Sequence, residues 1–290
     1  MDTNIKIGIA LAGGGLQGFS HIGALKALEE LGINIDYISG TSTGSVAAAL
    51  YAIGYSPIEI QKICEENYKR LLKVKKRKFF TIGKNFLFYK QTKVEGLIDG
   101  NTIKDFFNKY AKQKNIDLIT NIKNKKLAIT TVDTKTMKEC LFLSNELNQY
   151  QDNIQYITDI NIGQAVQSSM AFPGIFTPVN YKDYNFIDGG TINNLPVKIL
   201  RDMGATKTIS ISFDLYKYKP SSNIEGVVLR ALDIFSLHSV NRGKELSDVN
   251  IEVYNPNAAL INIKDLQETI DNGYNAVMKN KELIKKILCI

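Results

Sequence analysis

A serine lies between two glycines in Gly40-Thr41-Ser42-Thr43-Gly44, which has the spacing Gly-x-Ser-x-Gly. Apolar residues at positions 33–39 predict a short strand before this turn, and the alanine-rich stretch at positions 45–53 predicts a helix after it. On a sharp strand-to-helix turn a serine hydroxyl is lifted above the sheet edge, and flanking glycines avoid clashes with neighbouring backbone. Ser42 is therefore a candidate nucleophile for acyl transfer, with Gly40 and Gly44 supporting the turn. A serine that only caps the helix would fit the same residues.

A second glycine-rich turn, Gly13-Gly14-Gly15-Leu16-Gln17-Gly18, follows an apolar stretch at positions 5–12. It fits the dinucleotide fingerprint G-x-G-x-x-G, with Asp36 as the possible ribose ligand. It also fits a set of backbone N–H groups at a helix N-terminus, which would stabilise a developing negative oxygen. The residues beyond Asp36 lead directly into the Ser42 turn. The oxyanion interpretation therefore explains both turns, whereas the dinucleotide interpretation leaves Ser42 without a role.

A serine nucleophile needs a base to take its proton. The chain has two histidines. His21 falls in the helix expected after the glycine turn, where a packing role is favoured, and His238 has no acidic companion at a spacing that suggests a triad. Asp188 is the better candidate, because it ends a short predicted strand and precedes Gly189-Gly190. A partly desolvated carboxylate has a raised pKa and can act as a general base. The same Asp-Gly pair would also fit an ordinary β-turn.

Strand and helix patterns alternate along the chain and would position these residues. Strands are expected at 5–12, 33–39, 126–132, 139–143, 185–187, 206–213 and 250–254, and helices at 45–53, 162–170, 224–240 and 265–288. The last helix is expected to be interrupted at Gly273. This alternation predicts an α/β fold with a mostly parallel central sheet and helices on both faces. We expect a single domain over residues 1–290, with a basic, aromatic-rich cap or insert at about 62–96.

The net charge of +7 is concentrated in this insert. Eleven lysines and arginines stand against two glutamates between Lys62 and Lys93, a local charge of +9, so the rest of the chain is nearly neutral. The basic, aliphatic and aromatic residues between Lys69 and Lys90 suit peripheral contact with an anionic membrane. A solvated helix face or an RNA contact would fit the same composition. We expect the lipid surface and no nucleic-acid partner.

We expect no signal peptide, and the chain has no run of 18 or more apolar residues. Three widely spaced cysteines, Cys64, Cys140 and Cys289, fit reduced thiols. These features predict a cytoplasmic protein that is at most peripheral to a membrane. The sequence does not indicate an oligomeric state.

Four blocks in order along the chain resemble the patatin-like phospholipases, which are lipid acyl hydrolases with a Ser/Asp dyad. The blocks are residues 13–23, 40–44, 168–179 and 188–196, which include Ser168-Ser169-Met170-Ala171-Phe172-Pro173-Gly174 and Asp188-Gly189-Gly190 with Asn194-Leu195-Pro196.

The resemblance implies a three-layer α/β/α fold in which Ser42 is the nucleophile and Asp188 is the general base. It implies an oxyanion hole formed by the amides of Gly13, Gly14, Gly15 and Leu16, with Gly18, Gly40, Gly44, Gly189 and Gly190 supporting the motifs. Leu16 and Gln17 stand where the family usually has a basic residue, so only backbone groups would assist here.

The activity implied by the resemblance is that of a phospholipase A, lysophospholipase or esterase, acting through an acyl-enzyme without metal or cofactor. Its substrate would be a phospholipid or another acyl ester. Two other classes stay open: a dinucleotide-binding enzyme that uses the glycine-rich turn, and a lipid-binding protein without catalysis.

Overall fold

The computed structural model describes residues 5–71, 96–98, 100–214, 224–256 and 266–289. Its strands are β1 (Ile7–Leu11), β2 (Tyr37–Thr41), β3 (Gly96–Ile98), β4 (Lys126–Asp133), β5 (Lys138–Leu143), β6 (Ile154–Ile157), β7 (Gly174–Phe176), β8 (Val179–Tyr181), β9 (Tyr184–Asp188), β10 (Lys207–Phe213) and β11 (Val249–Val253). Its helices are α1 (Ser20–Glu30), α2 (Thr43–Ala52), α3 (Pro57–Leu71), α5 (Asn101–Gln113), α6 (Ile162–Ser169), α7 (Val197–Asp202), α8 (Ile224–Leu246), α9 (Leu266–Lys279) and α10 (Lys281–Leu288).

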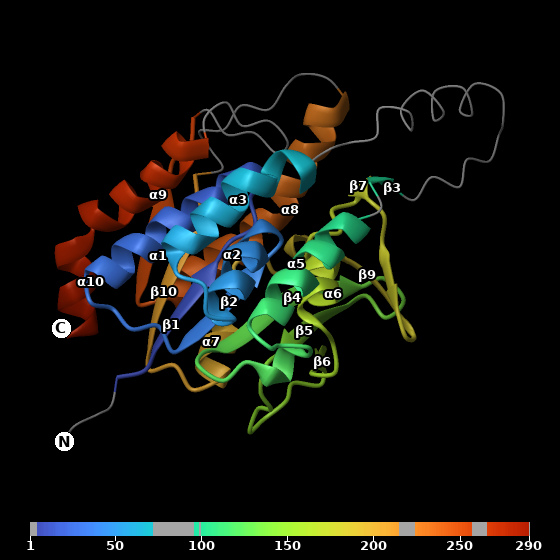
Figure 1. Ribbon diagram of the computed structural model, residues 1–290, viewed down its shortest axis with the longest axis horizontal. Helices are drawn as coiled ribbons and strands as arrows, with labels where there is room; N and C mark the ends of the chain where they lie inside the picture. The colour runs from blue at the N-terminus through green and yellow to red at the C-terminus, as the bar shows by residue number, and fades with distance from the viewer. Residues whose placement is uncertain (1–4, 72–95, 99, 215–223, 257–265, 290) are drawn as a thin grey trace.

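The main sheet has the strand order β11-β10-β1-β2-β4-β5-β6 among the described residues (Figure 1). The pairs from β11 to β4 and the pair β5–β6 are parallel, whereas β4–β5 is an antiparallel hairpin. β8 and β9 form a second antiparallel pair beside β4. The prediction of a mostly parallel α/β sheet is therefore confirmed.

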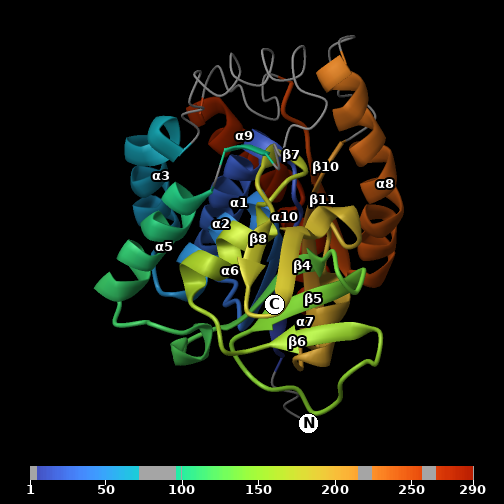
Figure 2. The same ribbon diagram turned by 90° about the vertical axis from the view of Figure 1, so that its right-hand side faces the viewer.

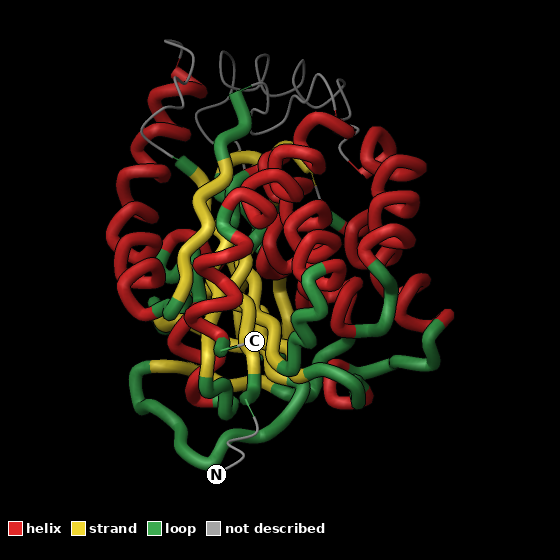
Figure 3. The backbone as a smooth tube through the Cα atoms, turned by 90° about the vertical axis from the view of Figure 1, so that its left-hand side faces the viewer, coloured by secondary structure: helices red, strands yellow, loops and turns green. Residues whose placement is uncertain are grey.

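Helices cover both faces of this sheet, as Figure 2 shows with α1, α2, α3 and α5 on one side and α8 on the other. α2 packs on β1, β2 and β4, while α7 packs on β1, β2 and β10. All five residues of β1 and of β2 are buried. A strand that is covered on both faces has no water-facing side, which accounts for the near-continuous apolar run in β1. The strands accordingly form the central layer in Figure 3.

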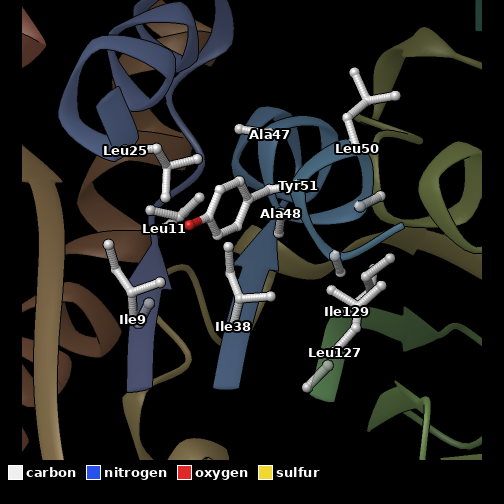
Figure 4. Packing of buried hydrophobic residues seen from close by; sticks show 14 of the residues in the cluster. Ile9, Leu11, Leu25, Ile38, Ala47, Ala48, Leu50, Tyr51, Leu127 and Ile129 are labelled. Carbon is white, nitrogen blue, oxygen red and sulfur yellow. The ribbon is translucent and has the colours of Figure 1, made fainter. Parts of the chain in front are cut away.

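The core between the sheet and α2 is built from aliphatic side chains (Figure 4). Ile9, Ile38 and Ile129 come from three neighbouring strands and are all completely buried. They face Ala48 and Tyr51 of α2, which are also buried. Truncation of a buried aliphatic side chain to alanine typically costs about 2–5 kcal/mol, so this packing holds α2 firmly against the sheet.

The expected interruption at Gly273 is wrong. α9 continues through this residue and ends at Lys279, and Asn280 separates it from α10. A Cβ atom on Gly273 would lie 1.8 Å from the Ser20 carbonyl oxygen, and one on Gly23 would lie 1.9 Å from the Ile270 carbonyl oxygen. The two glycines therefore allow the backbones of α1 and α9 to touch, which is why α9 tolerates a poor helix former.

β2 and β9 meet end to end on one edge of β4. Thr41 of β2 is in register with Thr130, and Asp188 of β9 is in register with Thr131. β5 pairs with β4 over the same stretch that β9 uses, so β9 must occupy the edge of β4 that β2 also occupies. The two strands run in opposite directions, and their carboxyl ends therefore arrive at the same point.

The inserted segment expected at about 62–96 begins inside α3, and residues 72–95 lie outside the described part of the chain. Its role as a cap or insert, and the single-domain organisation of residues 1–290, stay predictions.

Candidate active site

Ser42 occupies a sharp turn between β2 and α2. Its backbone φ is +52°, a left-handed value that is uncommon for a residue with a side chain and is typical of strained functional turns. Its hydroxyl makes no capping hydrogen bond to α2, so the alternative of a simple helix cap does not describe this residue. A Cβ atom on Gly40 would lie 2.5 Å from the Gly44 carbonyl oxygen, and one on Gly44 would lie 2.2 Å from the Leu11 carbonyl oxygen. A side chain at either position would clash with neighbouring backbone, so both positions require glycine.

Asp188 is the last residue of β9 and is almost completely buried. Its Oδ1 accepts a hydrogen bond from the Gly190 amide at 2.8 Å, whereas Oδ2 has no partner among the described residues. Burial raises its pKa from 3.8 to about 6, while the nearby Ser42 hydroxyl and the Gly190 amide oppose the rise. The Ser42 hydroxyl is therefore close enough to favour the carboxylate, although it makes no hydrogen bond of normal geometry to Oδ2.

The bare backbone of Gly189 lets the chain pass close to β4 directly after Asp188. A Cβ atom at this position would lie 2.4 Å from the Thr130 carbonyl oxygen. Thr130 is also the residue that faces Thr41 across the β2–β4 pair. Gly189 thus keeps Asp188 next to the point where β2 ends.

The first glycine-rich turn packs directly against the Ser42 turn. A Cβ atom on Gly13 would lie 2.9 Å from Ser42 Cβ, and one on Gly18 would lie 2.4 Å from Thr43 Oγ1. A Cβ atom on Gly14 would meet the Phe213 ring at 2.4 Å. These contacts explain why the turn requires glycine at three positions.

The amides of this turn differ in their hydrogen bonds. The Gly13 amide donates to the Asn194 carbonyl at 3.3 Å, and the Gly14 amide donates to Thr43 Oγ1 at 3.3 Å. The amides of Gly15 and Leu16 begin a 3₁₀ turn and have no acceptor within the described parts of the chain. Two unpaired donors therefore lie next to the nucleophile candidate.

Two residues of the site were not predicted. Asn194 donates from Nδ2 to the Gly13 carbonyl at 3.1 Å, which ties the glycine turn to the segment that follows Asp188. The Ser169 hydroxyl accepts the Ser42 amide at 2.9 Å and donates to the Thr130 carbonyl at 2.7 Å. Both lie in the blocks that resemble the patatin-like family, but the residue types alone do not reveal these contacts.

The two histidines have other environments. His21 is completely buried in α1, where its Nε2 lies 2.8 Å from the Ala12 carbonyl oxygen and its ring packs on Phe213. Burial lowers its pKa to about 4, so it is neutral near pH 7 and Nε2 is the donor to Ala12. His238 is exposed on α8. Neither forms a hydrogen bond with Ser42 among the described contacts.

Asp36 lies at the wrong end of the sheet to serve as a ribose ligand. Its carboxylate binds Lys6 Nζ at 3.0 Å and the Ile7 amide at 2.9 Å, at the start of β1. The glycine turn follows the other end of that strand. A dinucleotide held at the turn would therefore lack its acidic partner.

An apolar cavity of about 60 Å³ opens beside the glycine turn. Its described lining comes from the glycine turn, from α1, α2, α3 and α5, and from the residue that follows α6: Gly15, Leu16, Gly18, Phe19, Ile22, Thr43, Val46, Ala47, Ile60, Cys64, Ile103, Phe106, Phe107 and Met170. A cavity of this size has room for roughly four to six water-sized groups. Its surface suits a hydrocarbon chain and offers almost no polar partner.

In the part of the chain that the structure describes, histidine, cysteine, aspartate and glutamate side chains form no group of three that could hold a metal ion. No described helix has the length and apolar character needed to cross a membrane.

Comparison with known sequences gives one family. The family model described as patatin-like phospholipase matches residues 9–201. An uncharacterized protein of Acanthamoeba polyphaga mimivirus, R571, is 28% identical over 98% of this chain and 91% of its own length.

Two proteins of much greater length match 72% of this chain. They are the human patatin-like phospholipase domain-containing protein 6, at 32% identity, and lysophospholipase NTE1 of Meyerozyma guilliermondii, at 29% identity. The matched part spans only 13% of the length of either relative.

Solved structures support the fold. VipD from Legionella pneumophila superposes with a TM-score of 0.59 and 13% identity, covering 96% of this chain and 67% of that one. Human GIVD cytosolic phospholipase A2 gives a TM-score of 0.53 and 12% identity, covering 98% of this chain and 60% of that one. At these identities the likeness concerns the fold alone.

Proposed function

Because the chain belongs to the patatin-like phospholipase family, we propose that it is a lipid acyl hydrolase in which Ser42 and Asp188 form the catalytic dyad. One observation carries the proposal. A strained serine and a buried carboxylate with one unpartnered oxygen lie at the meeting point of β2 and β9. Such an arrangement costs stability and is typical of a site that does chemistry.

In the first half of the reaction Asp188 acts as the base. With its pKa near 6 it is ionised at neutral pH, and its free Oδ2 can take the proton from the Ser42 hydroxyl. The serine oxygen then attacks the ester carbonyl carbon. Collapse of the tetrahedral intermediate breaks the bond to the alcohol, which leaves with the proton held by Asp188. The acyl group remains on Ser42.

In the second half a water molecule replaces the alcohol. Asp188 takes a proton from the water as its oxygen attacks the acyl carbon, and the second intermediate expels the Ser42 oxygen. The proton returns to Ser42, and the products are a fatty acid and the free enzyme. The cycle consumes one water for each ester and needs no cofactor.

The glycine turn would hold the negative oxygen of both intermediates. Preorganised N–H donors are worth about 3 kcal/mol each in such a site. Within the turn from Gly13 to Leu16, the amides of Gly15 and Leu16 have no competing acceptor among the described residues, and they are the donors that we assign to this role. The amides of Gly13 and Gly14 already donate to Asn194 and Thr43. Their part is to bring the turn close to Ser42.

The apolar cavity would bind the acyl chain of the substrate. Its lining includes Gly15 and Leu16 of the glycine turn and Thr43, the residue after Ser42, together with apolar side chains of α3 and α5. A lipid ester is therefore a better substrate for this site than a polar one. The name of the yeast relative, a lysophospholipase, agrees with this class.

We also propose that the segment between Lys69 and Lys90 contacts an anionic membrane. This part of the proposal rests on the sequence. Most of this segment lies outside the described residues. Deleting it should reduce hydrolysis in anionic vesicles more than hydrolysis of a short soluble ester. An equal effect on both substrates would contradict a docking role.

The test of the function compares wild type with Ser42→Ala on a p-nitrophenyl acyl ester. Loss of a serine nucleophile should lower kcat by about 10³-fold or more, while the unfolding temperature stays close to wild type. Unchanged turnover would contradict the assignment of Ser42. Wild-type protein that binds lipid vesicles but hydrolyses no ester would favour the lipid-binding alternative.

A further inference from the structure

The Ser169 hydroxyl stands between the nucleophile's backbone and the neighbouring strand. It accepts the Ser42 amide at 2.9 Å and donates to the Thr130 carbonyl at 2.7 Å. Thr130 faces Thr41, the last residue of β2. The Ser42 amide and the Thr130 carbonyl both hydrogen-bond to the Ser169 hydroxyl oxygen. The hydroxyl therefore lies where a direct hydrogen bond between these two backbone groups would otherwise extend the β2–β4 pairing.

We propose that Ser169 is a positioning residue for the nucleophile. Its hydroxyl keeps the Ser42 amide away from β4, and this separation lets Ser42 leave the ladder with its left-handed backbone. Ser169 is completely buried, so loss of its hydroxyl would take a hydrogen-bond partner from the Ser42 amide and the Thr130 carbonyl away from the solvent surface. The inference rests on the proposed function, because it assigns Ser169 a part in the reaction of Ser42.

The same turn also holds the proposed base. Ala171, two residues after Ser169, accepts the Asp188 amide at 3.0 Å through its carbonyl oxygen. Ser169, the last residue of α6, thus binds the backbone of Ser42, and Ala171, just beyond the helix, binds the backbone of Asp188. The separation between nucleophile and base is set by a short covalent stretch in addition to the sheet.

Ser168 provides a matched control. It is completely buried, like Ser169, but its hydroxyl donates to the Gln164 carbonyl at 2.8 Å within its own helix. Ser168→Ala therefore removes the same atom from the same helix without touching the Ser42 turn. A role that is only structural predicts similar effects for the two substitutions.

The experiment compares Ser169→Ala, Ser169→Cys and Ser168→Ala in the full chain. We expect kcat on a p-nitrophenyl ester to fall about 10- to 100-fold in Ser169→Ala, with KM changed less than about twofold, because a small displacement of a reacting group costs this much. A thiol is a weak hydrogen-bonding group, so Ser169→Cys should be intermediate. Ser168→Ala should stay within about twofold of wild type. The acid limb of the pH profile should not move in any of the three.

Hydrogen exchange separates this inference from the proposed function. The peptide that contains Ser42 should lose amide protection in Ser169→Ala and keep it in Ser168→Ala, whether or not the protein hydrolyses the ester. Equal kcat and equal exchange in these two variants would overturn the inference. If Ser169→Ala does not fold, Ser169→Cys against Ser168→Ala decides it by the same two measurements.

Discussion

Ser42 and Asp188 lie at the carboxyl ends of two strands that run in opposite directions along one edge of β4. Thr41 faces Thr130 and Asp188 faces Thr131, so the two ends meet within one residue of register. Backbone pairing, rather than a loop, therefore sets the relation between the proposed nucleophile and base. Sites built on sheet elements hold their geometry more precisely than sites built on loops.

Asp188→Asn should remove the proposed base, and the wild-type pH profile should show the titration of its carboxyl group. Because burial raises the pKa of Asp188 to about 6, the carboxyl is protonated below this value and ionised above it. We expect wild-type kcat/KM to rise as pH increases through about 6 and then to level off. The variant should lose at least about 10³-fold at pH 8, where the wild-type base is fully ionised. A wild-type profile that is flat from pH 5 to 8 would rule out this base.

The same substitution should stabilise the fold at neutral pH. The folded pKa of about 6 lies above the ordinary value of 3.8, so ionisation of Asp188 destabilises the folded state relative to the unfolded state. This penalty is absent below about pH 3.8, grows as pH rises and is complete above about pH 6. Asp188→Asn removes a penalty of about 2–3 kcal/mol at pH 7, since each pKa unit corresponds to about 1.4 kcal/mol. Denaturant unfolding at pH 4 and pH 7 measures the change.

Asp133 on β4 is the matched control for that measurement. Burial acts to raise the pKa of its carboxyl, but hydrogen bonds from Asn185, Thr136 and Lys135 lower it overall. Its ionised form therefore stabilises the fold above about pH 4, and this contribution is lost as pH falls through the lowered folded pKa. Asp133→Asn should destabilise the protein at pH 7. If both substitutions shift stability in the same direction, the buried-charge argument for Asp188 fails.

Substitution of Cys64 tests the proposal that the apolar cavity binds the acyl chain. It lines the cavity from α3 and is buried, and burial raises the pKa of its thiol to about 12. We expect Cys64→Leu to fill part of the cavity and to shift the preference from long to short acyl chains, by about tenfold in kcat/KM between dodecanoate and butyrate esters. Cys64→Ala should keep the wild-type preference. A folded leucine variant with an unchanged chain-length profile would place the acyl chain elsewhere.

Gly273→Ala should destabilise the protein through the contact between α1 and α9. The new Cβ would lie 1.8 Å from the Ser20 carbonyl oxygen, so the two helices must separate. Overpacking of this kind typically costs about 1–3 kcal/mol. Asn275→Ala changes an exposed residue of the same helix and should have an effect within about 0.5 kcal/mol. Equal unfolding midpoints for the two variants would contradict the contact.

Local patterns in the sequence were sufficient to predict the two glycine-containing turns and the strands and helices beside them. The Ser42 turn depends on its own glycines and on the strand and helix beside it, and all of these are neighbours in the chain. Asp188 could be singled out for the same reason. Its distance from Ser42 could not be predicted, because it depends on β9 pairing with the edge of β4 that β2 uses.

Features that depend on distant partners were missed. Ser169 looks like any helix serine until β2 and β4 are placed beside it. A glycine within a helical pattern can end the helix or allow another helix to pack closely against it. For Gly273, only the position of α1 distinguishes the two. β6 and β8 are short and only partly buried, so their residues lack the apolar pattern that predicts a strand.

The contact between Gly23 and α9 also bears on how the protein is made. Every group that we assign to catalysis lies before residue 195, whereas α9, whose backbone touches that of α1, begins at residue 266. Synthesis at about 5–20 residues per second separates these two points by several seconds. His21 of α1 hydrogen-bonds to the Ala12 carbonyl, directly before the glycine turn. During this time α1 is not yet covered by α9. We expect nascent chains released before residue 266 to react slowly with a fluorophosphonate, so that ester hydrolysis begins only once synthesis has passed α9.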